Sequence, residues 1–186
     1  MKPRRRDSIL VESARLFAER GFGGTSIDAL GAAVGISGPG LYRHFRSKEE
    51  VLSEMLLAVC HEFEADLQSL LDSHADADDA LAALVRVRLR FAIDRRYELV
   101  VLDRELSSLP PTQHKAVRRL QRSGIELAAR IVSDANPPLL NGQAETLASL
   151  MFAMLTFPPP TVLPDPASIA ALERSAFAAM KHSVAA

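Results

Sequence analysis

The residues best suited to chemistry lie between positions 37 and 48, where hydroxyl, phenol, guanidinium, imidazole and ammonium groups follow one another closely. Such groups donate hydrogen bonds to phosphate oxygens and to the edges of bases. The rest of the chain offers no matching set of acid, base and nucleophile that would suit catalysis. The pattern therefore predicts contacts with nucleic acid rather than a chemical reaction.

The segment 25–48 that carries these groups is predicted to form two short helices joined by a glycine turn. A hydroxyl at Thr25 or Ser26 can cap the first helix. Gly35 can end it, because glycine accepts left-handed backbone angles at little cost. Pro39 falls in the first turn of the second helix, where a missing N–H does no harm. Two helices of this kind form a helix-turn-helix, whose second helix enters the major groove of DNA.

The stretch from about Ser8 to Lys48 resembles the DNA-binding head of the TetR family of bacterial repressors. The resemblance rests on ARLFAERGF at 14–22, TSIDALGAAVGIS at 25–37 and GLYRHFRSKEEVL at 40–52, in that order. It implies an all-α fold with an N-terminal three-helix head, residues 1–48, on a helical effector-binding and dimerisation body, residues 49–186.

The resemblance and the side-chain chemistry together give a set of expected DNA contacts. Gly38 and Gly40 would bring the backbone close to DNA without offering a hydrogen-bonding fork. The three arginines at 4–6 are either a basic arm that enters the minor groove or a solvated tail with general attraction to DNA. The full expected set is Arg4, Arg5, Arg6, Thr25, Ser37, Gly38, Pro39, Gly40, Tyr42, Arg43, His44 and Lys48.

Charge is distributed unevenly along the chain, although the formal net charge is only −1. Residues 1–48 hold nine Lys and Arg against four acidic residues, and the remainder holds 13 against 19. Neutralisation of phosphates with release of counterions supplies most of the general affinity for DNA. A basic head on an acidic body is consistent with a double-stranded DNA partner.

Further helices are predicted throughout the body. Ser47 with Glu50 forms a capping box that starts a long helix. Apolar periodicity predicts helices over 76–95, 97–109, 112–136, 141–157 and 169–180, and the proline-rich segment 156–166 is expected to be an extended loop. No apolar run of about 18 residues is present, no signal peptide is visible, and the single cysteine fits a reducing compartment. A cytoplasmic protein without membrane contact is therefore expected.

The helices expected at 141–157 and 169–180 have apolar stripes and many small residues, which permit close approach of a partner. In the resembled family such helices pair across a two-fold axis, which implies a homodimer that places two heads on an inverted repeat. The alternative is that the stripes close the core of the monomer. The expected interface residues are Leu147, Leu150, Met151, Met154, Ile169, Leu172, Ala176 and Met180.

Arg88 lies on the apolar stripe of the helix expected at 76–95. A buried cation needs a partner. That partner is either Glu105 or Asp103, in a structural ion pair, or the acidic group of an apolar effector such as a fatty acid, its CoA thioester or a lipophilic drug. The expected effector-binding residues are Met55, Val59, Phe63, Arg88, Phe91 and Tyr97.

An enzymatic function is not supported by the residue patterns. No Glu has a His three residues later, as a di-iron site would require, and the five histidines lack paired ligand spacing. Cys60 adjoins an apolar stripe, which is typical of a packing residue. We therefore expect no metal and no cofactor. The predicted function is that of a ligand-responsive transcriptional regulator, a repressor released from a palindromic operator by a small effector. The alternatives are a DNA-binding protein without an effector and an all-α enzyme.

Overall fold

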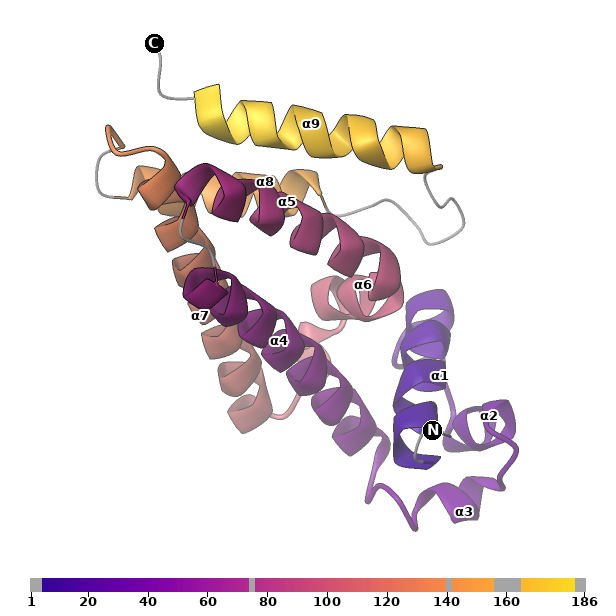
Figure 1. Ribbon diagram of the computed structural model, residues 1–186. Helices are drawn as coiled ribbons and strands as arrows, with labels where there is room; N and C mark the ends of the chain where they lie inside the picture. The colour runs from indigo at the N-terminus through magenta and orange to yellow at the C-terminus, as the bar shows by residue number, and fades with distance from the viewer. Residues whose placement is uncertain (1–4, 74–75, 140–141, 156–164, 183–186) are drawn as a thin grey trace. The chain divides into compact units, whose positions relative to one another are not determined.

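The computed structural model describes residues 5–73, 76–139, 142–155 and 165–182 (Figure 1). These residues form α-helices and one short 3-10 helix, with no strand among them, which confirms the all-α prediction. Two compact units are present. The first consists of the chain up to Val59 together with Tyr97–Arg118, and the second consists of Cys60–Arg96 and the chain from Arg119 onward.

The first unit holds the helix-turn-helix. It contains α1 (Arg5–Arg20), α2 (Ile27–Ala33), α3 (Gly38–Leu41), the first half of α4 (Lys48–Ser73), α6 (Arg96–Arg104), the 3-10 helix η1 (Leu106–Ser108) and the start of α7 (Pro111–Ala135). The second unit contains the rest of α4 and α7 with α5 (Ala77–Asp94), α8 (Gln143–Met154) and α9 (Pro166–His182). The division at residue 48 into a DNA-binding and an effector-binding domain concerns function and stays a prediction.

The predicted ends of the two motif helices are confirmed. The Ser26 hydroxyl accepts the Ala29 N–H at 3.1 Å at the start of α2, and the Ser37 hydroxyl accepts the Gly40 N–H at 3.1 Å at the start of α3. Gly35 lies between them with φ +71°, the left-handed conformation that glycine adopts without strain. Packing of α2 on both α1 and α3 buries Leu30 and Leu41 completely.

The predicted capping box at the start of α4 has two hydrogen bonds, and the structure forms one of them. The Ser47 hydroxyl accepts the Glu50 N–H at 3.2 Å, as expected. The Glu50 carboxylate, however, accepts the N–H of Arg46 rather than that of Ser47. The first bond satisfies a backbone donor that the helix start leaves without an intrahelical partner, and the second holds the residue that precedes the cap.

The helix expected over 97–109 is broken. Its first part is α6, which ends at Arg104, and its second part is η1. Glu105 joins them with φ −111° and ψ 8°, outside the α-helical region. Its side chain bonds to the turn after α1, and this tertiary contact is invisible to the local pattern.

The core of the second unit lies where α5, α8 and α9 meet the remaining parts of α4 and α7. Leu81, Leu84 and Val85 of α5 are fully buried there. Asp165 caps α9 by accepting the N–H groups of Ala167 and Ser168 at 2.9 and 3.0 Å. The loop predicted at 156–166 lies mostly outside the described residues. None of the described helices is long and apolar enough to cross a membrane.

Candidate DNA-binding face and effector residues

The corner between α2 and α3 is held together by two glycines. A Cβ on Gly31 would lie 2.8 Å from the Ile36 carbonyl oxygen, and a Cβ on Gly38 would lie 1.9 Å from the Asp28 carboxylate. Only glycine allows approaches this close without movement of the neighbours. Gly38 is buried, so its missing side chain serves packing of α3 on α2, which corrects the expectation that it brings backbone close to DNA.

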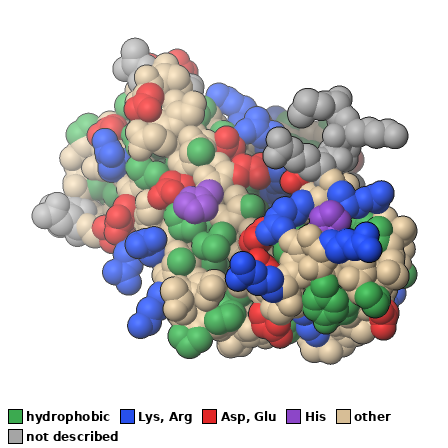
Figure 2. All heavy atoms as spheres, turned by 90° about the horizontal axis from the view of Figure 1, so that it is seen from below, with side chains coloured by type: hydrophobic (Ala, Val, Ile, Leu, Met, Phe, Trp, Pro, Cys, Tyr) green, Lys and Arg blue, Asp and Glu red, His purple; other side chains and the backbone are tan. Residues whose placement is uncertain are grey.

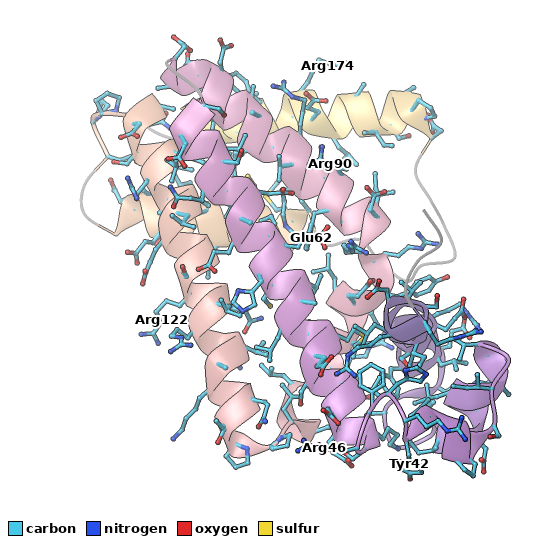
Figure 3. The ribbon with its side chains drawn as sticks, turned by 60° about the horizontal axis from the view of Figure 1, so that its bottom comes forward. Tyr42, Arg46, Glu62, Arg90, Arg122 and Arg174 are labelled. Carbon is cyan, nitrogen blue, oxygen red and sulfur yellow. The ribbon has the colours of Figure 1, made fainter. Side chains whose placement is uncertain are left out.

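Beyond this corner, the structure exposes a group of side chains that suit DNA contact. Ser37, Pro39, Tyr42 and Arg43 are exposed, and Tyr42 retains 55% of its accessible surface. Tyr42 lies at the outer side of the head in Figure 3. Gly40 and His44 are half-buried. Figure 2 shows Lys and Arg side chains beside exposed hydrophobic groups on one face of the molecule.

Thr25 and Lys48 have hydrogen-bond partners within the protein. Burial removes Thr25 from the DNA-binding face, whereas Lys48 is half-buried and its contact with DNA stays a prediction. Thr25 is buried, and its hydroxyl donates to the carbonyls of Leu16 and Gly21 at 3.3 and 2.9 Å. The Lys48 ammonium donates to the carbonyls of Phe22 and Thr25 at 2.7 and 2.9 Å. It also lies 4.3 Å from the centre of the Phe22 ring. Both residues therefore hold the turn between α1 and α2.

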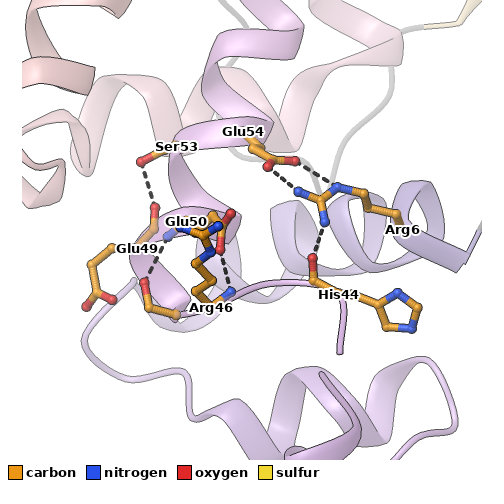
Figure 4. Close-up of polar contacts among 8 residues, drawn as sticks. Arg6, His44, Arg46, Glu49, Glu50, Ser53 and Glu54 are labelled. Carbon is orange, nitrogen blue, oxygen red and sulfur yellow. Dashed lines mark hydrogen bonds and ion pairs between the residues drawn. The ribbon is translucent and has the colours of Figure 1, made fainter. Parts of the chain in front are cut away.

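The expected basic arm is part of a helix where it is described. Arg4 lies outside the described residues, and α1 begins at Arg5, whose guanidinium donates to the Val34 carbonyl at 2.9 Å. Arg6 binds the Glu54 carboxylate of α4, with Nε to Oε2 at 3.0 Å, and donates to the His44 carbonyl (Figure 4). Arg6 also stacks on the Phe45 ring at 4.1 Å. The structure thus uses Arg6 to tie α1 to α4.

Glu105 is a residue whose contact the sequence did not predict. Its carboxylate accepts the Phe22 N–H at 3.0 Å and the Ser108 hydroxyl at 3.1 Å. The partner Phe22 is 83 positions away in the sequence, so no local periodicity or cap signal indicates the bond. The carboxylate joins the segment between α6 and η1 to the turn after α1.

In the second unit, Arg88 is buried among aromatic rings. Its Nη2 donates to the Phe152 carbonyl at 3.0 Å, and its guanidinium lies 5.3 Å from the Phe152 ring and 6.0 Å from the Phe63 ring. Phe63 also packs against Phe91, with centroids 4.8 Å apart. Burial lowers the pKa of Arg88 to about 10. The guanidinium remains charged at neutral pH.

The expected ion pair of Arg88 with Glu105 or Asp103 would join the two units and stays a prediction. Glu105 is engaged by Phe22 and Ser108, while Arg88 uses a carbonyl in the last turn of α8. Carbonyls at a helix C-terminus lack intrahelical donors and carry partial negative charge, which makes them suitable partners for a cation. Of the other expected effector residues, Met55, Val59 and Tyr97 belong to the first unit, and a role in effector binding stays a prediction for all six.

The expected dimer residues divide by exposure. Met151, Ala176 and Met180 are buried in the core of the second unit, so for these three the alternative of a monomer core holds. Leu147 and Ile169 are half-buried. Leu150, Met154 and Leu172 are exposed by 54%, 66% and 36%. The periodicity did not separate the two groups, because both occur on the same helices.

No group of His, Cys, Asp and Glu within the described ranges has the geometry to hold a metal ion. Cys60 is buried, and burial raises the pKa of its thiol to about 12, which keeps it protonated. Its environment is that of a packing residue.

Comparisons with known proteins agree with the head and the fold. The sequence model for bacterial regulatory proteins of the tetR family matches residues 9–55. The transcriptional repressor KstR2 of Mycolicibacterium smegmatis is 30% identical over 125 residues, which cover 62% of this chain and 60% of the repressor. The chain spans between 48% and 60% of the length of the KstR2 proteins that it matches.

Solved structures extend the likeness to nearly the whole chain. A TetR-family regulator from Bordetella parapertussis superposes with a TM-score of 0.85 at 25% identity, covering 94% of this chain and 93% of its own. The structure of AibR in complex with isovaleryl coenzyme A and operator DNA shares the fold, with a TM-score of 0.77 at 20% identity and coverage of 94% and 97%. The helix-turn-helix, the nearly complete superposition and the family match at its N-terminus lead to one assignment: residues 9–55 form a DNA-binding head of the tetR family of bacterial regulatory proteins, on a chain that has the fold of a TetR-family regulator.

Proposed function

We propose that the protein is a transcriptional repressor that binds an inverted-repeat operator in the cytoplasm and is released by a small amphipathic effector. The observation that carries this proposal is the helix-turn-helix corner, closed by Gly31 and Gly38, with Tyr42 and Arg43 exposed beside it. A phenol and a guanidinium at this position suit phosphate and base edges. The relative KstR2 is a transcriptional repressor, which favours repression over activation.

Selection of bound sequences from random double-stranded DNA tests the proposal, because it finds the operator without a candidate sequence. We expect an inverted repeat, with half-sites about 34–36 Å apart or a multiple of that spacing. Tyr42→Ala and Arg43→Ala should each lower the affinity for it by about tenfold or more. Arg122→Ala, which changes an exposed arginine of α7 (Figure 3), is the matched control. Unchanged affinity in both head variants would contradict the assigned face.

We infer a homodimer formed by the exposed hydrophobic residues of α8 and α9. Leu150 and Met154 of α8 are exposed, as is Leu172 of α9, and α9 carries small exposed side chains that permit close packing. The double variant Leu150→Glu/Leu172→Glu should sediment as a monomer with intact helical content, because an unpaired charge at a packed interface is strongly unfavourable. Val11→Glu, at another exposed hydrophobic residue, is the control. A dimer in the double variant would place the interface elsewhere.

The effector is inferred to be an apolar molecule with an acidic group, such as an acyl-CoA thioester. Support comes from Arg88, a buried cation held by a helix-end carbonyl beside the rings of Phe63 and Phe152. An anionic group forms strong charge-assisted hydrogen bonds with a guanidinium. The isovaleryl coenzyme A bound to AibR, which has the same fold, is consistent with this class.

Isovaleryl coenzyme A and longer acyl-CoA thioesters are the probes for this part of the proposal. Each is added to the operator complex, and release is measured by fluorescence anisotropy. Arg88→Met should retain operator binding and lose release by the active thioester. A release curve identical to that of the wild-type protein would exclude the anchor. Absence of release by every probe in the wild-type protein would favour a DNA-binding protein without an effector of this class.

A further inference from the structure

The turn that follows α1 is bonded to two elements outside the three helices of the head. Its central residue, Phe22, donates its N–H to Glu105 at 3.0 Å and accepts the Lys48 ammonium at its carbonyl at 2.7 Å. Glu105 lies between α6 and η1, and Lys48 is the first residue of α4. One residue of the head is thus held on its two sides by groups of opposite charge.

The hydrogen bond between the Phe22 N–H and the Glu105 carboxylate is held in place on both sides, by the bonds of Glu105 and by the backbone of Gly21. The second carboxylate oxygen accepts the Ser108 hydroxyl at 3.1 Å, and the Glu105 N–H donates to the Val101 carbonyl at 2.8 Å. On the other side, Gly21 has φ +75°, and a Cβ there would lie 3.4 Å from the Glu105 carboxylate. The left-handed backbone of Gly21 is therefore what requires glycine here, and the carboxylate lies in ordinary contact beside it.

The same turn determines where α2 begins. Thr25 is buried and donates to the Gly21 carbonyl at 2.9 Å, and its own carbonyl accepts Lys48 at 2.9 Å. Ser26, the cap of α2, follows directly. The first turn of α2 begins only a few residues after Phe22, so its position depends on that of the Phe22 peptide. Helix α3 in turn packs on α2.

We propose that Glu105 is a positioning residue that couples the α6–η1 segment to the DNA-binding head. Its carboxylate holds the Phe22 N–H, so the α6–η1 segment sets the position of the α1–α2 turn and through it the α2–α3 corner. A displacement of α6 either breaks the bond between Glu105 and Phe22 or moves the α1–α2 turn with it, and in both cases the affinity for DNA changes. This coupling rests on the proposed function, since it presupposes that the α2–α3 corner binds an operator.

Three variants test the coupling in the full-length protein. Glu105→Ala removes the acceptor, and Glu105→Gln keeps an amide oxygen in the same place. Asp103→Ala is the matched control, because it removes an exposed carboxylate from the last turn of α6. The readouts are affinity for the selected operator and hydrogen exchange of the Phe22 amide and of α2. Thermal unfolding monitors global stability.

We expect Glu105→Ala to weaken operator binding by about tenfold, within the usual range of coupling between sites. Exchange at the Phe22 amide and in α2 should rise while the other helices remain protected. Glu105→Gln should restore most of the affinity, which a general loss of stability would not predict. If Glu105→Ala does not fold, Glu105→Gln is compared with the wild-type protein at the Phe22 amide. If Glu105 holds this amide, a carbonyl oxygen in place of the carboxylate must change the resonance and the hydrogen exchange of the Phe22 N–H.

Operator affinity and α2 exchange in Glu105→Ala equal to those of Asp103→Ala would overturn the coupling. Failure of the proposed function gives a different result. In that case the wild-type protein and Asp103→Ala select no DNA sequence, while the exchange experiment still reports whether Glu105 controls the turn and α2.

Discussion

Replacement of Gly31 by alanine tests whether the α2–α3 corner depends on backbone contact. The new methyl carbon would lie 2.8 Å from the Ile36 carbonyl oxygen and 3.0 Å from the carbonyl carbon and oxygen of Ser37. All three neighbours are backbone atoms, so no side-chain rotation relieves the contact. Ordinary contact begins at 3.4 Å, and the corner must open by roughly half an ångström.

The expected cost follows from two opposing contributions. Overpacking of this kind costs about 1–3 kcal/mol. Alanine gains up to about 1 kcal/mol over glycine in a helix. Because all three close neighbours are backbone atoms, we expect an overpacking cost of about 2–3 kcal/mol, in the upper part of that range. The free energy of unfolding should therefore fall by about 1–2 kcal/mol, which lowers Tm by roughly 2–8 °C in a chain of this length. Operator affinity should fall as well, because α3 is displaced from α2.

Gly124→Ala is the matched control for this experiment. Gly124 lies inside α7, and a Cβ there would make ordinary contact with the Phe63 ring at 3.6 Å. Without a clash, only the helix propensity changes, and the free energy of unfolding should rise by up to about 1 kcal/mol. Urea unfolding followed by circular dichroism measures both variants. A Gly31→Ala protein as stable as the wild-type protein would refute the packing argument.

Three further results are expected. The Cys60 thiol, whose pKa burial raises to about 12, should react with iodoacetamide far more slowly in the folded than in the unfolded protein, and equal rates would contradict its burial. Ser13→Ala should leave the free energy of unfolding unchanged or raise it by about 1 kcal/mol, because the buried hydroxyl has no hydrogen-bond partner within the described residues; a clear loss in urea unfolding would argue otherwise. Hydrogen bonds from the Ser168 hydroxyl and nearby N–H groups lower the pKa of Asp165, so its stabilisation is complete above the ordinary pKa and is lost as the pH falls through the lower folded value. Asp165→Ala should therefore flatten this part of the curve of Tm against pH, and an unaltered curve would exclude the effect.

Local signals predicted the head well. Ser26, one of the two hydroxyl residues expected to cap the first helix, is its cap, and Gly35 forms the expected turn, because caps and turns depend on residues within four positions of one another. The exposed side chains at Tyr42 and Arg43 followed from the same short-range geometry.

Contacts between distant segments were beyond the sequence pattern. Lys48 was expected to contact DNA and Glu105 was expected as a partner of Arg88, yet both bind the backbone of the α1–α2 turn. The apolar periodicity of α8 and α9 likewise indicated which faces are hydrophobic without showing what covers them. Met151 meets the core of its own unit, whereas Leu150, one position earlier, is exposed.

The two glycines of the α2–α3 corner also limit how the sequence preference of such a head can be altered in the laboratory. Any side chain introduced at Gly38 would force the Asp28 carboxylate to move, and one introduced at Gly31 would meet backbone atoms that cannot rotate away. Diversity at Pro39, Tyr42 and Arg43 changes exposed side chains, whereas Ser37 is exposed but caps α3. A library built on these three positions, with Ser37 and both glycines kept, would therefore sample new operators while retaining folded proteins.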